Sequence, residues 1–343
     1  MAENMKWIDS KCETHVVPKS VHGVPTYIDA GKDFKVHPGY SSDGQFVAAN
    51  LKGDDGREFG VMLHIMCVNP EIDPNKYPVI LSIITMSDFT NHKYMAKEDA
   101  CMAPNISYSE ERLDVTTPVS YIRGNADTVE CGTDLPDGAG RIDLKLKCTG
   151  PVLYNCATGQ FPFLNDEVLA YQYSVPTMEA TGTMKLDGRE YKVSGPAWLD
   201  RQWGNGSEDF VKRTFKWKWM NLQLNNGYRI SVWDVVVNDK KENAWATVLS
   251  PEGAHFVVDI EPFSKGEGEF YTGKTGQIYP TKYRIEIPQI SSYFDVKVRD
   301  LPEQEIVSAM GEDKYEAACT FTGSFMGKEV EGFNYVELVG SFR

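Results

Sequence analysis

A charged pair between two indoles is the first feature of the sequence that could do chemistry. Asp200 and Arg201 are adjacent, and Trp198 and Trp203 flank them. Apolar walls lower the local dielectric constant and strengthen electrostatic interactions, while aromatic faces bind cations and flat polyenes. We interpret the stretch as one wall of a deep apolar pocket with a few polar groups pointing into it. The alternative is an ion pair that holds one domain against the other.

A hairpin downstream supplies further candidates. The segment FKWKWMNLQL is followed by Asn226-Gly227 and then by YRISVWDVVV, a pattern typical of two strands joined by a tight turn. A two-residue turn would place Asp234 directly opposite Trp219. Asp234 would then be a buried acid with a raised pKa, or else a carboxylate paired with Arg201, a lysine or a backbone amide. The same face would carry Trp217, Asn221 and Gln223.

Other candidates lie on the remaining predicted strands. A two-residue turn at Asp55-Gly56 would place Gln45 and His64 on one face of an earlier hairpin, although His64 also fits a core histidine. Tyr171 and Tyr173 are two residues apart, so they share one side of a strand. The set of substrate-binding candidates is completed by Trp233 and Asn334.

Composition limits the partners that we expect. The net charge of -14 argues against binding to nucleic acid or to an anionic membrane surface. There is no apolar run of 18 residues that could span a membrane. Seven scattered cysteines and six histidines lack metal-ligand spacing, so we expect no metal site. The N-terminal residues contain no apolar core of a secretory signal, so we expect a cytoplasmic protein.

The strand pattern predicts an all-β protein. Many short strands alternate with Gly, Asn and Asp turns, and no amphipathic helix exceeds two or three turns, which favours barrels or sandwiches. A chain of 343 residues is long enough for two domains. Each half has an Asn-Gly or Asp-Gly hairpin near its start, which indicates two similar β domains.

Several segments together resemble a known family. They are NLKGDDGREFGVML, YSVPTMEATGTMKLDGREYKVSGPAWLDRQWG, WKWMNLQLNNGYRISVWDV, IYPTKYRIEIP and YEAACTFTGSFMGKEVEGFNYVELVG. The order is similar to that of the AttH/CrtC-like superfamily, which includes carotenoid 1,2-hydratases, kievitone hydratase, and fungal Diels–Alderases and hetero-Diels–Alderases. The resemblance implies two lipocalin-like β-barrel domains packed in tandem, over residues 1–205 and 206–343. It also implies a cofactor-free pocket at or between the barrels, with the tryptophan-rich segment in its wall.

The chain departs from this family at one position. The usual Asp-His-x-Trp-Gly reads here as Asp200-Arg201-Gln202-Trp203-Gly204. The resemblance implies that hydratases use this histidine near the protonated alkene, and a guanidinium does not titrate near neutral pH. A guanidinium can instead bind an enolate, a ketone or a developing oxyanion. This difference favours a cyclase that acts on an oxygenated, conjugated substrate.

Three functions follow as hypotheses. The first is a cyclase that catalyses a [4+2]-type cycloaddition, hetero-Diels–Alder included, on an apolar oxygenated polyene, terpenoid or polyketide. It would hold a near-attack conformer while Arg201 polarises an oxygen. The walls would be Tyr173, Trp203, Trp217 and Trp219, and the orienting groups Gln45, Asn221 and Asn334.

The second hypothesis is a hydratase or proton-initiated isomerase of an isoprenoid alkene, with Asp234 as general acid. The third is a non-catalytic carrier of an apolar ligand. Asp200 and Asp234 both remain catalytic candidates, because the sequence does not decide which of them faces the pocket. The expected partner is a small apolar substrate, and a homodimer is left open.

Overall fold

The computed structural model describes residues 20–21, 24–25, 27–69, 76–161, 170–205, 215–237, 241–263, 266–308 and 313–342. Residues 1–19, from which we expect no secretory signal, lie outside these ranges, and the expected junction at 205/206 adjoins another undescribed stretch. Within the described ranges, helical structure is limited to short 3-10 turns: η1 (Pro136–Gly138), η2 (Asn155–Ala157) and η4 (Pro288–Ile290). No helix in the described part of the chain is long and apolar enough to cross a membrane.

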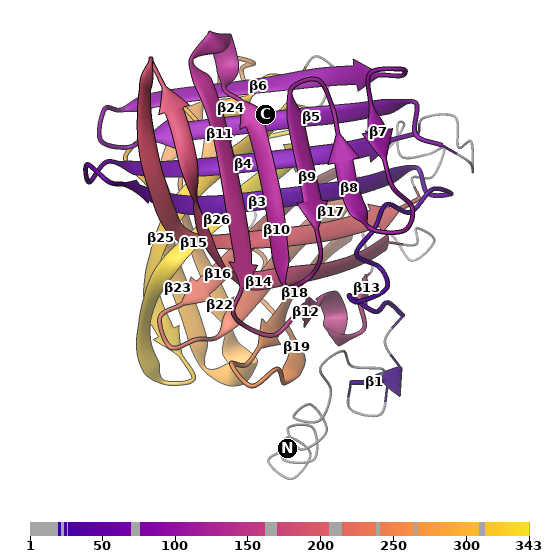
Figure 1. The fold of residues 1–343 in the computed structure, drawn as a ribbon. Helices are drawn as coiled ribbons and strands as arrows, with labels where there is room; N and C mark the ends of the chain where they lie inside the picture. The colour runs from indigo at the N-terminus through magenta and orange to yellow at the C-terminus, as the bar shows by residue number, and fades with distance from the viewer. Residues whose placement is uncertain are drawn as a thin grey trace.

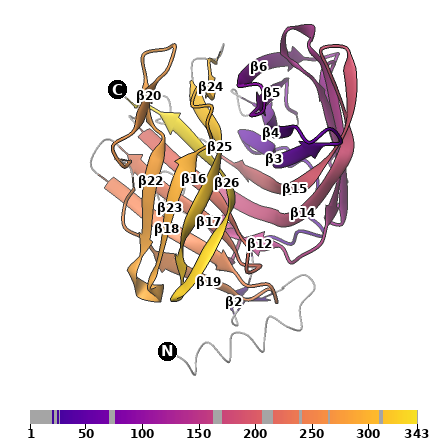
Figure 2. The same cartoon turned by 90° about the vertical axis from the view of Figure 1, so that its left-hand side faces the viewer.

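Two strongly curled antiparallel sheets form the molecule (Figures 1 and 2). This arrangement confirms the predicted all-β fold of two barrel-like units in tandem. The N-terminal sheet has the order β6-β5-β4-β3-β15-β14-β11-β10-β9-β8-β7, and β12 and β13 also pair with β14. Its strands are β3 (Ser42–Gly53), β4 (Glu58–Val68), β5 (Val79–Asp88), β6 (Lys93–Met102), β7 (Ser107–Tyr108), β8 (Leu113–Thr116), β9 (Ser120–Gly124), β10 (Thr128–Asp134), β11 (Gly140–Cys148), β12 (Leu153–Tyr154), β13 (Gln160–Phe161), β14 (Ala170–Leu186) and β15 (Arg189–Gly204).

The C-terminal sheet has the order β19-β18-β17-β16-β26-β25-β23-β22, and β24 also pairs with β25. Its strands are β16 (Phe215–Leu224), β17 (Arg229–Val237), β18 (Lys241–Leu249), β19 (His255–Asp259), β22 (Lys282–Ile287), β23 (Ser292–Val298), β24 (Glu305–Ile306), β25 (Lys314–Phe325) and β26 (Lys328–Gly340). Two small hairpins lie apart from both sheets, formed by β1 (Ser20–Val21) with β2 (Val24–Pro25) and by β20 (Phe270–Thr272) with β21 (Ile278–Pro280).

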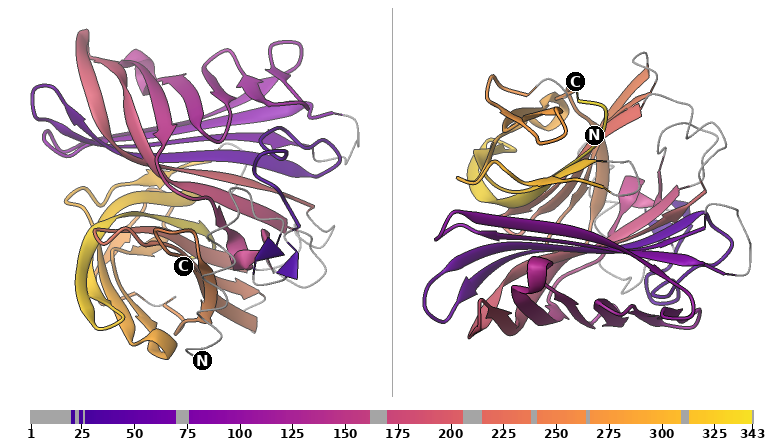
Figure 3. Two further views of the ribbon diagram at one scale, coloured as in Figure 1. Left: turned by 60° about the horizontal axis from the view of Figure 1, so that its bottom comes forward. Right: turned by 90° about the horizontal axis from the view of Figure 1, so that it is seen from above.

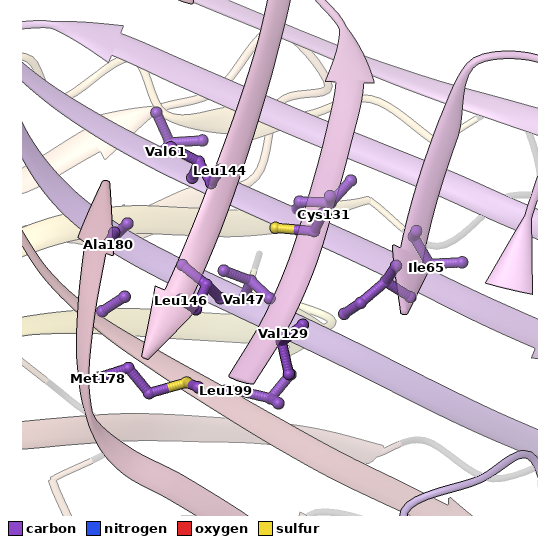
Figure 4. Packing of buried hydrophobic residues seen from close by; sticks show 14 of the residues in the cluster. Val47, Val61, Ile65, Val129, Cys131, Leu144, Leu146, Met178, Ala180 and Leu199 are labelled. Atoms are coloured by element: carbon purple, nitrogen blue, oxygen red, sulfur yellow. The ribbon is translucent and has the colours of Figure 1, made fainter. Parts of the chain in front are cut away.

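Each sheet encloses a core of its own because it curls back on itself. In the N-terminal core, Val47 and Ile65 from the first strands belong to the same buried cluster as Val129 and Leu146 from later ones (Figure 4). The C-terminal sheet encloses a separate cluster. A third cluster lies between the two sheets, whose stacking is seen best in Figure 3. The fold therefore has three distinct interiors in which a functional side chain could lie.

The segment from residue 27 to residue 41 seals part of the N-terminal core. Its apolar residues Ile28, Phe34 and Val36 are buried in that cluster. The backbone N–H of Val36 donates to the Ser109 carbonyl at 3.2 Å. The Tyr77 hydroxyl donates to the His37 carbonyl at 2.7 Å. The segment is therefore tied to the sheet by main-chain hydrogen bonds as well as by apolar packing.

The prediction of a two-residue turn at Asp55-Gly56 is wrong. Lys52 pairs with Glu58, and the Gly53 N–H donates to the Arg57 carbonyl, so the loop has one residue more than expected. Gly56 has a φ of 88°, the left-handed conformation that ends a three-residue turn with a bulge. By contrast, the hairpin predicted at Asp187-Gly188 does have two residues in its turn, because Leu186 pairs with Arg189.

The same one-residue difference changes the tryptophan-rich hairpin. The Leu224 N–H donates to the Tyr228 carbonyl across three loop residues, and Gly227 has a φ of 91°. Asp234 consequently pairs with Lys218 and not with Trp219, which corrects the predicted register. Because a shift of one residue moves a side chain to the other face of a sheet, Asp234 leaves the indole face and Trp233 joins it.

Candidate active site between the sheets

Strand alternation places the Asp200 and Arg201 side chains on opposite faces of β15. Arg201 pairs with Gln45 and belongs to the face that lines the N-terminal core, whereas Asp200 pairs with Phe46 on the face toward the C-terminal sheet. The first hairpin follows the same division: His64 pairs with Phe46, and Gln45 pairs with Ile65. The predicted common face of Gln45 and His64 is therefore wrong, and the two halves of the charged pair belong to different environments.

Arg201 is a fully buried structural cation. Its Nη1 donates to Asp43 Oδ1 and to the Gly44 carbonyl, both at 2.8 Å, and its Nη2 donates to the Lys35 carbonyl. Asp43 also accepts from His37 Nδ1 at 2.8 Å and from Gln45 Nε2 at 2.6 Å. Burial alone would raise the pKa of Asp43, but the Arg201 and His37 partners lower it. Arg201 thus ties the 27–41 segment to the sheet and points away from Asp200 and from the layer between the sheets.

Three aromatic candidates accompany Arg201 in the N-terminal unit. Trp203 stacks on His37 with 4.0 Å between ring centroids and on Tyr171 with 5.8 Å. Tyr173 meets Trp203 edge-on and donates its hydroxyl hydrogen to the Asp33 carbonyl at 3.3 Å. The two tyrosines do share one side of β14, and that side faces away from the C-terminal sheet.

Two further candidates point into the C-terminal core. Asp234 accepts a hydrogen bond from the Phe263 backbone N–H at 3.0 Å, which matches the alternative of a backbone-paired carboxylate. Asn334 pairs with Cys319 on the inner face of β26, and its Nδ2 donates to the Tyr335 carbonyl at 3.3 Å. Neither side chain faces the layer between the sheets.

The remaining candidates meet in the layer between the sheets. The ring centroid of Trp219 lies 5.4 Å from that of Phe46 and 6.3 Å from that of Trp198. Both partners project from the N-terminal sheet. Trp233 lies 6.3 Å from Trp219 and stacks on Trp245 at 5.8 Å. Trp217 belongs to the same cluster, and the Asn221 side chain accepts from the Tyr335 N–H at 2.6 Å. The indoles therefore form one continuous wall between the sheets.

Asp200 is an acid at this wall, in contact with the Trp198 indole. It is 5% exposed, and its Oδ1 accepts hydrogen bonds from Trp198 Nε1 at 2.6 Å and from the Ser174 hydroxyl. Burial raises the pKa of Asp200 to about 7, against the effect of these two donors, and the charge of Glu337 contributes in the same direction. The side chain can therefore be either an acid or a base at neutral pH.

Two glutamates on the C-terminal sheet complete the acidic cluster. Glu316 on β25 pairs directly with Glu337 on β26. Glu337 Oε1 accepts from Trp217 Nε1 at 2.6 Å. Glu316 is fully buried, and among the described residues neither of its carboxylate oxygens has a hydrogen-bond donor. Burial, reinforced by Glu337 and opposed by Lys314, raises the pKa of Glu316 well above its usual value.

The imidazole of His64 and the phenol of Tyr335 lie in the same layer between the sheets. Burial, together with the Lys314 ammonium, lowers the pKa of His64 to about 3, so the imidazole is neutral. A Cβ at position 44 would come within 2.8 Å of His64 Nε2, so Gly44 makes room for the ring. A Cβ at position 60 would come within 2.9 Å of the Tyr335 hydroxyl, so Gly60 permits close approach of the two sheets.

Four residues of this layer are not among the candidates predicted from residue types alone: Glu316, Glu337, Lys314 and Tyr335. A signal was present, because YEAACTF and YVELV each place one glutamate in an apolar strand. Acids almost never occur fully buried without a partner or a function. Among the described residues no group of three or more His, Cys, Asp and Glu side chains is arranged to hold a metal ion. The site thus combines acids of raised pKa with an indole wall, which suits proton transfer to an apolar molecule.

Comparisons with known proteins identify relatives with named activities. The AttH-like family model matches residues 24–341. Dehydratase asqC of Emericella nidulans is 28% identical over 178 residues, covering 49% of this chain and 50% of that protein. Kievitone hydratase of Fusarium solani subsp. phaseoli is 26% identical over 213 residues, covering 58% and 57%. The chain thus spans little more than half the length of these relatives.

A solved structure shares the fold. The crystal structure of kievitone hydratase from Nectria haematococca superposes with a TM-score of 0.75 at 21% identity, covering 90% of this chain and 92% of that one. At this level of identity the likeness establishes the fold alone.

Proposed function

Because the chain belongs to the AttH-like family, whose relatives include a hydratase and a dehydratase, we propose that it is a hydratase or dehydratase of a small apolar metabolite. The observation that carries the proposal is Asp200, a buried carboxyl with a pKa near neutrality inside an indole wall. General acid–base catalysis is most efficient when the pKa of the group lies near the working pH. This proposal replaces Asp234 with Asp200 as the general acid of the second hypothesis.

The sign of the charge in the site supports protonation of an electron-rich alkene. Asp200, Glu316 and Glu337 bring acids to the layer, whereas Lys314 is the cation beside them and His64 is neutral. Carboxylates and indole faces stabilise a developing carbocation. An enolate would need cationic or N–H donors instead. We therefore favour an isoprenoid-type alkene, or the corresponding tertiary alcohol, as substrate.

The cyclase hypothesis loses the residue on which it depended. The Arg201 guanidinium is already bonded to Asp43 and to two backbone carbonyls, and it faces the N-terminal core. The guanidinium lies on the opposite side of β15 from the indole wall, so it cannot polarise a substrate oxygen in the layer between the sheets. The carrier hypothesis would leave the cost of burying Glu316, whose oxygens have no donor among the described residues, without a compensating role.

The solvent label tests the proposal. Prenylated phenols, terpenoid alkenes and their tertiary alcohols are incubated with the protein in ¹⁸O-labelled water and, separately, in D₂O. The proposal predicts ¹⁸O in the alcohol with the wild type, and a loss of roughly 100-fold or more in turnover with Asp200→Asn. Ring formation without ¹⁸O or carbon-bound deuterium would instead support a cyclase. A bound but chemically unaltered ligand would support a carrier.

A further inference from the structure

Glu316 and Glu337 form a carboxyl pair, fully buried at Glu316 and half-buried at Glu337, to which the proposed reaction has so far assigned no proton transfer. Their direct pairing places both side chains on the face of the C-terminal sheet that meets the N-terminal sheet. Directly opposite side chains on one face have Cβ atoms about 4.5–5.5 Å apart. Two carboxylates at such a distance repel each other if both are charged.

The contacts of the pair indicate where a proton must lie. Glu316 and Glu337 are direct register partners on adjacent strands, yet neither Glu316 oxygen has a donor among the described residues. Two neighbouring carboxyl groups can form a hydrogen bond with each other only when one of them is protonated. A proton between them removes the repulsion and also supplies the missing donor, as in other carboxyl pairs that share a site.

We propose that Glu316 and Glu337 share one proton and serve as a second acid–base group, on the opposite sheet from Asp200, which exchanges a proton with the reacting water. This inference rests on the proposed function. Purely structural acids are an inadequate explanation, because apolar or amide side chains of similar size would fill the same space at lower cost. The charged and titratable groups that face the pair are Asp200 from β15, Tyr94 from β6, Lys314 from β25 and Tyr335 from β26, and His64 from β4 lies near Lys314.

The two acid–base groups divide the reaction. In hydration, the protonated Asp200 gives its proton to the alkene carbon and leaves a carbocation. Water then bonds to the cationic carbon and gives up a proton to the pair, which passes from one shared proton to two. Transfer of a proton from the pair back to Asp200 restores the starting state. Dehydration is the reverse, and no other reactant is needed. The more polar surroundings of the pair, with Lys314 and Tyr335, suit water better than the indoles around Asp200 do.

A spectroscopic test of the shared proton needs no substrate. Infrared difference spectra are recorded about two units above the pKa of Asp200, where Asp200 is ionised. We expect a carboxylic acid C=O band in the wild type that shifts in D₂O. The band should be absent from Glu316→Gln and unchanged in the control variant Glu329→Gln, which removes an exposed glutamate from the same β26 strand. Absence of the band in the wild type would overturn the shared proton.

Turnover then tests the catalytic role separately from the proposed function. With any probe that the wild type labels with ¹⁸O, Glu316→Gln and Glu337→Gln should each lower kcat about 100-fold and change the pH profile. Glu316→Gln should unfold at the wild-type temperature or above it, because the change removes a buried acid that has no donor among the described residues. If both retain wild-type kcat and pH profile while Asp200→Asn is inactive, the pair is not catalytic and the proposed function stands. If the wild type labels none of the probes, the proposed function fails, whatever the infrared result.

Discussion

Two buried aspartates on neighbouring strands, Asp43 and Asp200, meet opposite surroundings. Asp43 on β3 accepts hydrogen bonds from Arg201, His37 and Gln45, and these partners keep its pKa below the usual value. Among the described residues Asp200 on β15 has two donors, both neutral, an indole and a hydroxyl, and burial raises its pKa to about 7. The two carboxyls differ in partners far more than in burial.

This difference separates structural charge from reactive charge. A carboxylate that faces a guanidinium stays ionised over the whole physiological range, so it can hold chain segments together but cannot exchange protons. A buried carboxyl without a cation beside it has a raised pKa and can titrate near neutrality. Groups with such perturbed pKa values cluster at functional sites. The side of β15 on which a residue lies therefore decides its role, although the residues are adjacent in the sequence.

The largest effect should come from removing the structural cation. Arg201→Met leaves Asp43 buried with a charge that only His37 and Gln45 still contact, and breaking a buried pair in this way costs about 3–5 kcal/mol. Urea denaturation measures this loss as a lower free energy of unfolding. The folded fraction should convert substrate with a kcat within a few-fold of the wild type. The reason is that the guanidinium points away from Asp200, Glu316 and Glu337.

Two companion variants guard against failure to fold. Arg201→Lys keeps a cation and should lose less stability. The double variant Asp43→Leu with Arg201→Met removes both charges and should recover most of the loss. A stable Arg201→Lys protein that loses most of its turnover but still binds product would contradict the comparison, and would restore Arg201 to the mechanism as the cyclase hypothesis requires.

The pH dependence of stability should have opposite signs at the two aspartates. Asp200 has a raised pKa in the folded state, so the folded protein binds more protons than the unfolded chain between about pH 4 and 7. Its contribution to stability is therefore lost as the pH rises through 7. A shift of about three units corresponds to at most about 4 kcal/mol.

Asp200→Asn should accordingly be more stable than the wild type by up to about 4 kcal/mol at a pH above 7, and nearly equal to it near pH 4. Asp43→Asn is the matched comparison. Because the pKa of Asp43 is lowered, its contribution is present above the unfolded pKa and is lost as the pH falls. Thermal melts across pH that show the same sign for both variants would break the distinction between the two sites.

Most of the fold could be predicted from the sequence, and the register could not. Alternating apolar residues and the turn at Asp187-Gly188 correctly indicate strands and hairpins. At Asn226-Gly227 the corresponding dipeptide signal forms the last two residues of a three-residue loop. A glycine in the left-handed conformation suits both turn types, so the dipeptide alone cannot determine the loop length. That single residue exchanges the faces of Asp234 and Trp233.

The site was harder to predict than the fold for a related reason. Alternation within β15 already implies that Asp200 and Arg201 point to opposite faces, but the interior that each face meets depends on how the two sheets pack. Glu316 and Glu337 are 21 positions apart in the sequence and meet only because β25 and β26 pair. Local patterns therefore identified the indole wall, while the acids that face it required the tertiary structure.

The smallest expected effect is the change in the pKa of Asp200 when it loses the hydrogen bond from the Trp198 indole. Trp198→Phe removes one of the two donors to Asp200 Oδ1, and the hydrogen bond favours the ionised form. A hydrogen bond to a charged group contributes about 1.5–3 kcal/mol, but the remaining Ser174 donor compensates in part. We therefore expect the pKa of Asp200 to rise by about one unit. For a group that acts as the acid in hydration, the alkaline limb of the pH–rate profile should move upward by the same amount.

Trp203→Phe is the control from the other side of β15. Trp203 stacks on His37 in the N-terminal unit and makes no hydrogen bond to Asp200, so its replacement should leave the alkaline limb in place. Equal shifts from the two variants would mean that the limb reports general loosening of the strand and not the local hydrogen bond. A shift from Trp198→Phe alone would link the measured pKa to the carboxyl between the sheets, because only that carboxyl loses a donor.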